Sequence, residues 1–164
     1  MAGWTEIEST TLASPAASVS FTTGLGGYAF FRLTAYIVND ANAKTILLRF
    51  NNDSGMNYSR QTISALSTTV EGARETSQAS VGLVYGSLAA SEQASFGLLV
   101  AKPSASVKAQ VTALTGYDHS TGISLALNGG EWNNTSNLIS AIALLPSSGN
   151  FDTGSSFLLE GLAA

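Results

Sequence analysis

The chain has 164 residues, with seven Lys or Arg against eleven Asp or Glu, one His and no Cys. A single domain of this length can bury roughly two-thirds of its unfolded surface, so its hydrophobic core needs no disulfides. The absence of Cys excludes a disulfide framework, a thiolate nucleophile and a Cys-ligated metal site. A net charge of −4 argues against nucleic acid or a membrane as a partner. We therefore expect one domain over residues 1–164.

Hydroxyl side chains, rather than charged ones, dominate the polar residues. Ser and Thr together make 39 of the 164 residues and charged residues only 11%, against roughly 25% in ordinary soluble domains. Because a free monomer stays soluble mainly through charge, this composition favours a chain covered by neighbours in an assembly, with a weakly charged monomer as the alternative. The first six residues lack the basic and apolar segments of a signal peptide.

Apolar residues recur with a period of two along nearly the whole chain, which predicts strands rather than helices. The predicted strands cover residues 4–9, 17–22, 28–38, 45–51, 56–63, 80–85, 95–101, 106–114, 123–127, 138–144 and 156–162. Residues 28–38 carry apolar side chains on both faces, which predicts a central strand covered on each side. Residues 52–55 have turn composition and predict a hairpin between the strands beside them, whereas residues 65–79 are interpreted as a loop.

Short strands at this spacing, with no amphipathic helix between them, predict an all-β fold. We expect an antiparallel β-sandwich, jelly-roll-like, with about ten strands. Its core should be carried by ten apolar side chains distributed over these strands. They are Val19, Phe21, Phe30, Leu33, Leu48, Phe50, Leu99, Leu125, Ile142 and Phe157.

The candidate catalytic residues all have a simpler interpretation. His119 lies within residues 116–122, whose composition is that of a surface turn, so we interpret it as a turn residue rather than a general base. The acidic residues offer pairs, but no pair lies in a hydrolase motif. The Asn- and Asp-rich turns at residues 39–42 and 51–54 lack the several carboxylates of a calcium loop. We therefore expect a non-enzymatic protein with no catalytic residue, no cofactor and no metal.

One segment has the chemistry of a sugar site. Trp132 is preceded by a carboxylate and followed by two amides, and such an indole can stack on a sugar ring while its neighbours hydrogen-bond the hydroxyls. The alternative is that Trp132 closes the core or lies in a subunit interface. Two further residues are interpreted as ordered and exposed. The candidates for contact with a partner or a glycan are therefore Trp132, Glu131, Asn133, Asn134, Tyr117 and Arg74.

Three parts of the sequence together resemble a recurring pattern. Trp4 lies in the opening segment, and residues 49–58 carry the motif Arg-x-Asn-x-x-x-Gly-x-x-Tyr. Near the C-terminus, residues 154–161 carry the motif Gly-Ser-x-x-x-Leu-x-Gly. This pattern resembles that of small β-rich virion proteins of tailed bacteriophages, which include capsid decoration (cement) proteins and related fibre-head domains. The resemblance covers nearly the whole chain, is much weaker over residues 65–122, and departs at Glu160, where an aromatic is common.

The resemblance implies a non-enzymatic virion component, often a trimer, that either cements the capsid or forms a fibre head touching the host. A fibre head normally follows a shaft, whereas the first predicted strand here begins within four residues of Met1. We therefore expect a capsid decoration protein on the virion surface, with the major capsid protein as partner and a homo-trimer as its assembly state. The alternative is a receptor- or glycan-binding head module of a tail fibre.

Overall fold

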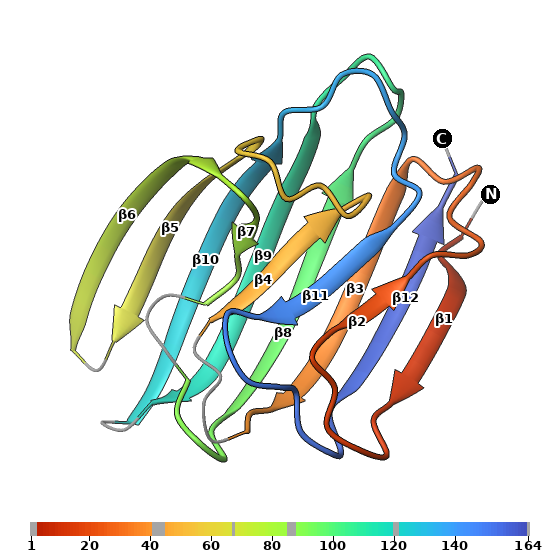
Figure 1. Cartoon of the computed structure of the whole chain (residues 1–164). Coiled ribbons are helices and arrows are strands. Elements are labelled where there is room, and N and C mark those ends of the chain that lie inside the picture. The colour runs from red at the N-terminus through yellow and green to blue at the C-terminus, as the bar shows by residue number, and fades with distance from the viewer. Residues whose placement is uncertain (1–2, 41–44, 67, 85–87, 120–121, 164) are drawn as a thin grey trace.

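The computed structural model describes residues 3–40, 45–66, 68–84, 88–119 and 122–163. These residues form two antiparallel sheets packed face to face, with no helix among them (Figure 1). The twelve strands are β1 (Thr5–Thr11), β2 (Val19–Phe21), β3 (Phe30–Val38), β4 (Ile46–Phe50), β5 (Tyr58–Leu66), β6 (Thr69–Gln78), β7 (Val81–Gly82), β8 (Gln93–Ala101), β9 (Ala109–His119), β10 (Gly122–Trp132), β11 (Ile142–Pro146) and β12 (Ser156–Leu162). The predicted antiparallel β-sandwich is confirmed, with twelve strands in place of about ten. The described chain accordingly holds no helix long and apolar enough to cross a membrane.

The order of the strands is that of a jelly roll with additions. The smaller sheet runs β2-β11-β4-β7, and the larger sheet runs β1-β12-β3-β8-β9-β10-β5-β6. Without β1, β12 and the β9–β10 hairpin, two four-stranded sheets remain, β2-β11-β4-β7 and β3-β8-β5-β6. The β9–β10 hairpin therefore widens the larger sheet in its middle, and β6 lies beyond the cover of the smaller sheet (Figure 1).

The β9–β10 hairpin pairs over eleven residues in unbroken register. His119 lies opposite Gly122 at one end of the pairing, and Ala109 lies opposite Trp132 at the other. β8 pairs along the other side of β9, and β5 pairs along the other side of β10. Because side chains alternate between the two faces of a strand, this register decides which residues of the hairpin enter the core.

The core lies between the two sheets and is built mainly from their inward-facing side chains. Seven of the ten expected core residues are buried, namely Val19, Phe21, Leu33, Leu48, Phe50, Ile142 and Phe157. Phe30 is half-buried. The predictions for Leu99 and Leu125 are wrong, since 44% and 49% of these residues are exposed. Their neighbours Leu98 and Ala126 take the inward positions, so the alternation along β8 and β10 turns Leu99 and Leu125 to the outer face.

The predicted hairpin around residues 52–55 is also wrong. β4 pairs with β11 and β7 in the smaller sheet, whereas β5 pairs with β10 and β6 in the larger one. The connection begins with Asn51 and Asn52 in the left-handed region, at φ of 53° and 54°, a conformation that Asn tolerates. It carries the chain from one sheet to the other, and the Tyr58 hydroxyl accepts a hydrogen bond from the Phe50 amide at 2.9 Å.

Two further strand predictions need correction. Residues 65–79, interpreted as a loop, are largely strand, because β5 extends into them and β6 covers Thr69–Gln78. Their polar composition hid the strand, since β6 is an edge strand exposed along most of its length. β3 is paired on both sides but covered on one face only, with Arg32, Thr34 and Tyr36 turned to solvent.

Candidate functional site

The outer face of the larger sheet, which points away from the smaller sheet, exposes a group of large apolar side chains. We call this group the leucine face and define it by Ile63, Leu99, Leu114, Ile123, Leu125 and Leu127. Its members come from β5, β8, β9 and β10, and between 44% and 81% of each residue is exposed. Single exposed apolar residues are ordinary, but a contiguous group is typical of an interaction surface.

The strand register makes the leucine face contiguous. Leu114 lies opposite Leu127, and Leu127 lies opposite Ile63, so three apolar side chains stand side by side across β9, β10 and β5. Residues directly opposite each other in a sheet have Cβ atoms about 4.5–5.5 Å apart, close enough for their side chains to touch. Leu125 lies two residues from Leu127 on the same face of β10 and extends the patch along the strand.

Glycines lie between these leucines on the same face. Gly97 pairs with Leu114, and Gly116 pairs with Leu125. A Cβ at Gly97 would meet no atom within 4 Å, and one at Gly116 would meet only a serine Oγ at 3.9 Å. Packing within the chain therefore does not require glycine here. Because Gly weakens a strand interior and often marks a site of close approach by another chain or ligand, these positions indicate a docking face.

Charged residues flank the leucine face at both sides of the sheet. Near the β12 side, Arg32 donates two hydrogen bonds to Glu160, at 2.6 and 2.7 Å, and its guanidinium lies 5.0 Å from the centre of the Trp4 ring. These hydrogen bonds lower the pKa of Glu160 and raise the pKa of Arg32. Glu160, at the position where an aromatic residue is common in the sequence pattern, thus forms an ion pair with Arg32 on the neighbouring strand. Arg74 lies at the opposite side, on β6.

Trp132 lies in the core, which corrects the expectation of an exposed indole. The residue is 1% exposed, and its ring centre lies 5.5 Å from that of Phe50 and 6.5 Å from that of Tyr58. Its Nε1 donates a hydrogen bond to the Asp53 carboxylate at 2.7 Å. The indole is therefore covered by neighbouring aromatic rings and does not present a face to a sugar, so the alternative in which Trp132 closes the core describes this structure.

Asp53 organises the connection beneath Trp132, a function that the turn composition of residues 51–54 did not reveal. Its carboxylate also accepts hydrogen bonds from the Gly55 amide at 2.8 Å and from the Asn57 side chain at 2.9 Å. Burial by itself would raise the pKa of Asp53, but the hydrogen bonds from Trp132, Asn57 and Gly55 outweigh it and lower the pKa. The connection is a structural turn that fixes the aromatic part of the core.

The remaining predicted contact residues on strands divide between the core and the outer face. Tyr117 is buried on the inward side of β9, so the expectation that it is exposed is wrong. Arg74 is exposed, and Glu131 is half-buried with its carboxylate 3.2 Å from the Lys108 ammonium. Arg74 and Glu131 both line a hollow of about 420 Å³ on the outer face. The structure therefore brings these two predicted residues together beside the leucine face.

The two asparagines after Trp132 are engaged within the chain. The Asn133 amide donates to a backbone carbonyl at 2.7 Å. The Asn134 carbonyl accepts from the Lys102 ammonium at 2.7 Å, and its side chain accepts from two backbone amides that follow it, at 2.9 Å each. Lys102 is buried and lies 5.4 Å from the centre of the Trp132 ring, and this burial lowers its pKa. These contacts hold the loop after β10 against the core.

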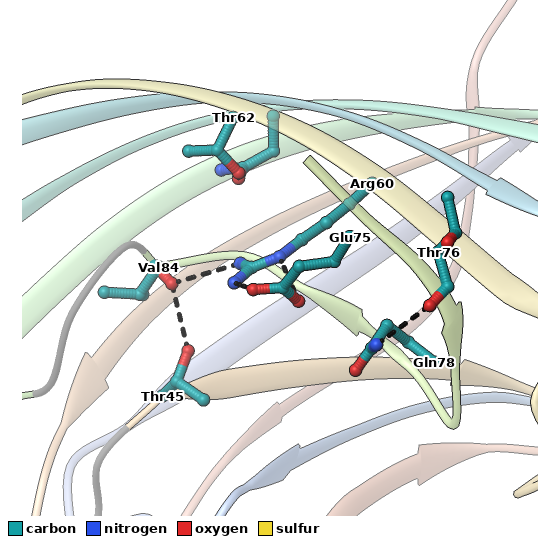
Figure 2. Close-up of polar contacts among 8 residues, drawn as sticks. Thr45, Arg60, Thr62, Glu75, Thr76, Gln78 and Val84 are labelled. Atoms are coloured by element: carbon teal, nitrogen blue, oxygen red, sulfur yellow. Dashed lines mark hydrogen bonds and ion pairs between the residues drawn. The ribbon is translucent and has the colours of Figure 1, made fainter. Parts of the chain in front are cut away.

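A polar cluster that the sequence did not reveal braces β5 and β6 (Figure 2). Arg60 donates to both carboxylate oxygens of Glu75, at 3.0 and 2.8 Å, and to the Val84 carbonyl at 3.4 Å. The hydrogen bonds from Arg60 lower the pKa of Glu75. Beside them, the buried Thr62 hydroxyl donates to Asn128 at 2.6 Å. The cluster ties the edge of the larger sheet to the segment after β7 and so fixes β5, which carries Ile63 at one end of the leucine face.

His119, which its sequence context predicts to be a turn residue, ends β9, and its side chain and Ser120 lie outside the described residues. Within the described ranges, no three His, Asp or Glu side chains gather closely enough to hold a metal ion.

Comparisons with known proteins do not identify a family for this chain. No protein family matches its sequence, and no curated protein does. Among solved structures, one similar chain is a xylan β-1,4-xylosidase from Bacillus halodurans C-125, with a TM-score of 0.24 and 5% sequence identity. The match covers 83% of this chain and spans 28% of the xylosidase chain. A similarity of this size carries no inference about activity.

Proposed function

We propose that this chain is a non-enzymatic structural protein of a tailed-bacteriophage virion, a capsid decoration protein that binds the major capsid protein on the outer surface of the shell. The observation that carries the proposal is the leucine face, a contiguous apolar surface on a chain of low charge. Such a surface is more typical of a protein that assembles with others than of a monomer in solution. The sequence pattern at Trp4 and at residues 49–58 and 154–161 supports the virion as the place of assembly.

The action of such a protein is mechanical. A protein that binds the assembled shell and not its dissociated subunits stabilises the shell by mass action. The resemblance further implies a homo-trimer. At any copy number, a self-associated decoration protein makes several shell contacts at once, and the linked contacts bind more tightly than a single one.

The location of the protein in the parent virion is the first test. Immunogold labelling or cryo-electron microscopy should place it over the capsid faces. Density confined to the tail tip would contradict capsid decoration and would support the fibre-head alternative.

The contribution of the leucine face is tested by sedimentation with capsids that lack the protein. Leu127→Asp places a charge on the leucine face and should reduce the amount of protein that pellets with the shells. The matched control is Leu138→Asp, because Leu138 is equally exposed (53% against 48%) but lies outside the larger sheet. Equal pelleting of the two variants would contradict a function of the leucine face in assembly.

A second candidate, a glycan-binding fibre head, is favoured by one groove. Tyr36 is 41% exposed on the outer face and lines a groove of about 760 Å³ together with hydroxyl side chains that include Ser9, Thr34 and Ser156. An exposed aromatic ring beside fixed hydroxyls suits a sugar. On a glycan array, a fibre head should bind a defined sugar and lose that binding in Tyr36→Ala. Retention of binding in the variant would contradict this groove as the site.

A further inference from the structure

The larger sheet has a centre and two ends that differ in a regular way. Its eight strands divide evenly at the boundary between β8 and β9. One row of paired residues crosses all eight strands through Leu99, beginning with the acidic Glu6 on β1 and ending with the basic Arg74 on β6. Acidic and basic side chains therefore stand at opposite ends of this row, and the two charged residues between them, Arg32 and Glu160, pair with each other.

We infer that the outer face of the larger sheet is a self-association surface, onto which a second copy of this chain packs the same face about a two-fold axis parallel to the strands at the β8–β9 boundary. In this arrangement β10 and β5, which carry Leu125, Leu127 and Ile63, lie over β3 and β12 of the other copy. The inference rests on the proposed function, because it names the partner of the same surface. A two-fold interface brings one patch against itself, so the patch must be complementary to itself. Shape, charge and area each meet this requirement.

The shape of the face supplies both knobs and hollows. Leu114 on β9 projects beside Gly97 on β8, where a hollow of about 370 Å³ is lined by Gly97, Leu99 and Leu114. Rotation about the two-fold axis exchanges the position of β8 with that of β9. Leu114 of each copy therefore comes over the hollow at Gly97 of the other. The absence of a Cβ at Gly97, which packing within the chain does not require, leaves room for this side chain.

The charges follow the same symmetry. Rotation about this axis brings the β6 end of one sheet over the β1 end of the other. Each Arg74 then comes to the side of the partner that carries Glu6, and both side chains are exposed in the single chain. Two sheets that pack face to face keep their strands within roughly 30° of each other, as a two-fold axis parallel to the strands allows. Arg32 and Glu160 already neutralise each other within one copy.

The outer face of the whole larger sheet is large enough for a stable pair. Eight strands about 4.8 Å apart and about seven residues of about 3.3 Å each give roughly 900 Å² per copy. An ordinary stable interface buries about 800 Å² per partner. A second copy that packs on the whole outer face thus buries the area of an ordinary stable interface, and the leucine face is part of that area.

Sedimentation equilibrium of the full chain without capsids tests the pairing independently of shell binding. We expect a reversible equilibrium between monomer and dimer. A monomer at every concentration would overturn the self-association, and a trimer would overturn the two-fold geometry while agreeing with the copy number that the family resemblance implies. The proposed function is judged separately by the location of the protein in the virion, so either proposal can fail alone.

Two sets of variants test the geometry. Gly97→Val fills the hollow and should weaken the dimer at least about tenfold, a change of about 1.4 kcal/mol. The matched control Gly26→Val, at an exposed position where a Cβ also meets no atom within 4 Å, should leave the dimer intact. Equal dimer dissociation constants for the two variants would overturn the proposed contact.

The charge contact is tested by exchange. Arg74→Glu alone and Glu6→Arg alone should each weaken the dimer roughly two- to fivefold, as expected for exposed ion pairs. The double variant restores opposite charges at each contact and should recover the affinity of the unmodified chain. A double variant as weak as the two single variants would overturn the two-fold arrangement. Circular dichroism of each variant monitors folding.

Discussion

Leu98 and Leu99 are adjacent residues of β8 with opposite surroundings, since Leu98 is buried while Leu99 lies on the leucine face. Leu98→Ala opens a cavity in the close-packed core and should lower the free energy of unfolding by about 2–5 kcal/mol. Complete burial of a Leu side chain contributes about 1.5–3 kcal/mol, and Leu99 is half covered, so Leu99→Ala should lower the free energy of the monomer by roughly 1 kcal/mol.

Urea unfolding followed by circular dichroism measures both values, at protein concentrations low enough for the chain to be monomeric. The slope of the unfolding free energy against urea concentration should be the same in both variants and in the unmodified chain. The two variants should have the opposite order of effects on self-association. Leu99→Ala should weaken the dimer, whereas Leu98→Ala should leave the affinity of the folded chain unchanged. A loss of monomer stability in Leu99→Ala equal to that in Leu98→Ala would refute the reasoning, because the outer face would then be packed as tightly as the core.

Four further predictions concern the core, the connection at Asp53 and two glycines of the larger sheet. Because the pKa of Asp53 is lowered in the folded chain, its stabilising contribution is complete above the unfolded pKa of about 3.9 and is lost as the pH falls through the lower folded value. The loss of stability between about pH 6 and about pH 3 should therefore be smaller in Asp53→Asn than in the unmodified chain, and equal losses in urea unfolding would contradict this. Trp132→Phe keeps an aromatic ring but removes the donor to Asp53, and it should lower the free energy of unfolding by about 2–3 kcal/mol; an unchanged urea midpoint would show that this hydrogen bond contributes nothing. Gly161→Ala should destabilise by about 1–3 kcal/mol, because its Cβ would come within 2.5 Å of the Tyr28 ring. Gly97→Ala should instead stabilise the monomer by about 0.5–1 kcal/mol, and thermal melts that shift in the same direction for both variants would contradict the packing described.

The β9–β10 hairpin connects the fold to the proposed function. It is the addition that separates β8 from β5 in the jelly-roll order, and it carries Leu114, Ile123, Leu125 and Leu127 of the leucine face. Of the leucine face, Leu99 and Leu114 lie within residues 65–122, where the resemblance to phage virion proteins is weakest, and the other four residues lie outside this range. The hairpin therefore supplies most of the apolar surface.

The sequence by itself was sufficient for the class of the fold. Alternation with a period of two is a local property, so it identified strands without knowledge of their partners. The C-terminal strand was predicted at residues 156–162, the bounds that β12 has in the structure. The same alternation identified most of the core, because large apolar residues such as Phe21, Leu33 and Phe50 are buried wherever the sheets meet.

Only the tertiary structure decided which strands pair and which faces are covered. The turn at residues 52–55 has the composition of a hairpin, yet the chain changes sheets there, because β11 and β7 pair with β4 while β10 and β6 pair with β5. Leu99 and Leu125 look like core residues because alternation defines two faces of a strand but does not say which one another sheet covers. Since the smaller sheet packs against one face of the larger sheet, the leucines of the other face remain exposed to solvent. These exposed leucines form the candidate site.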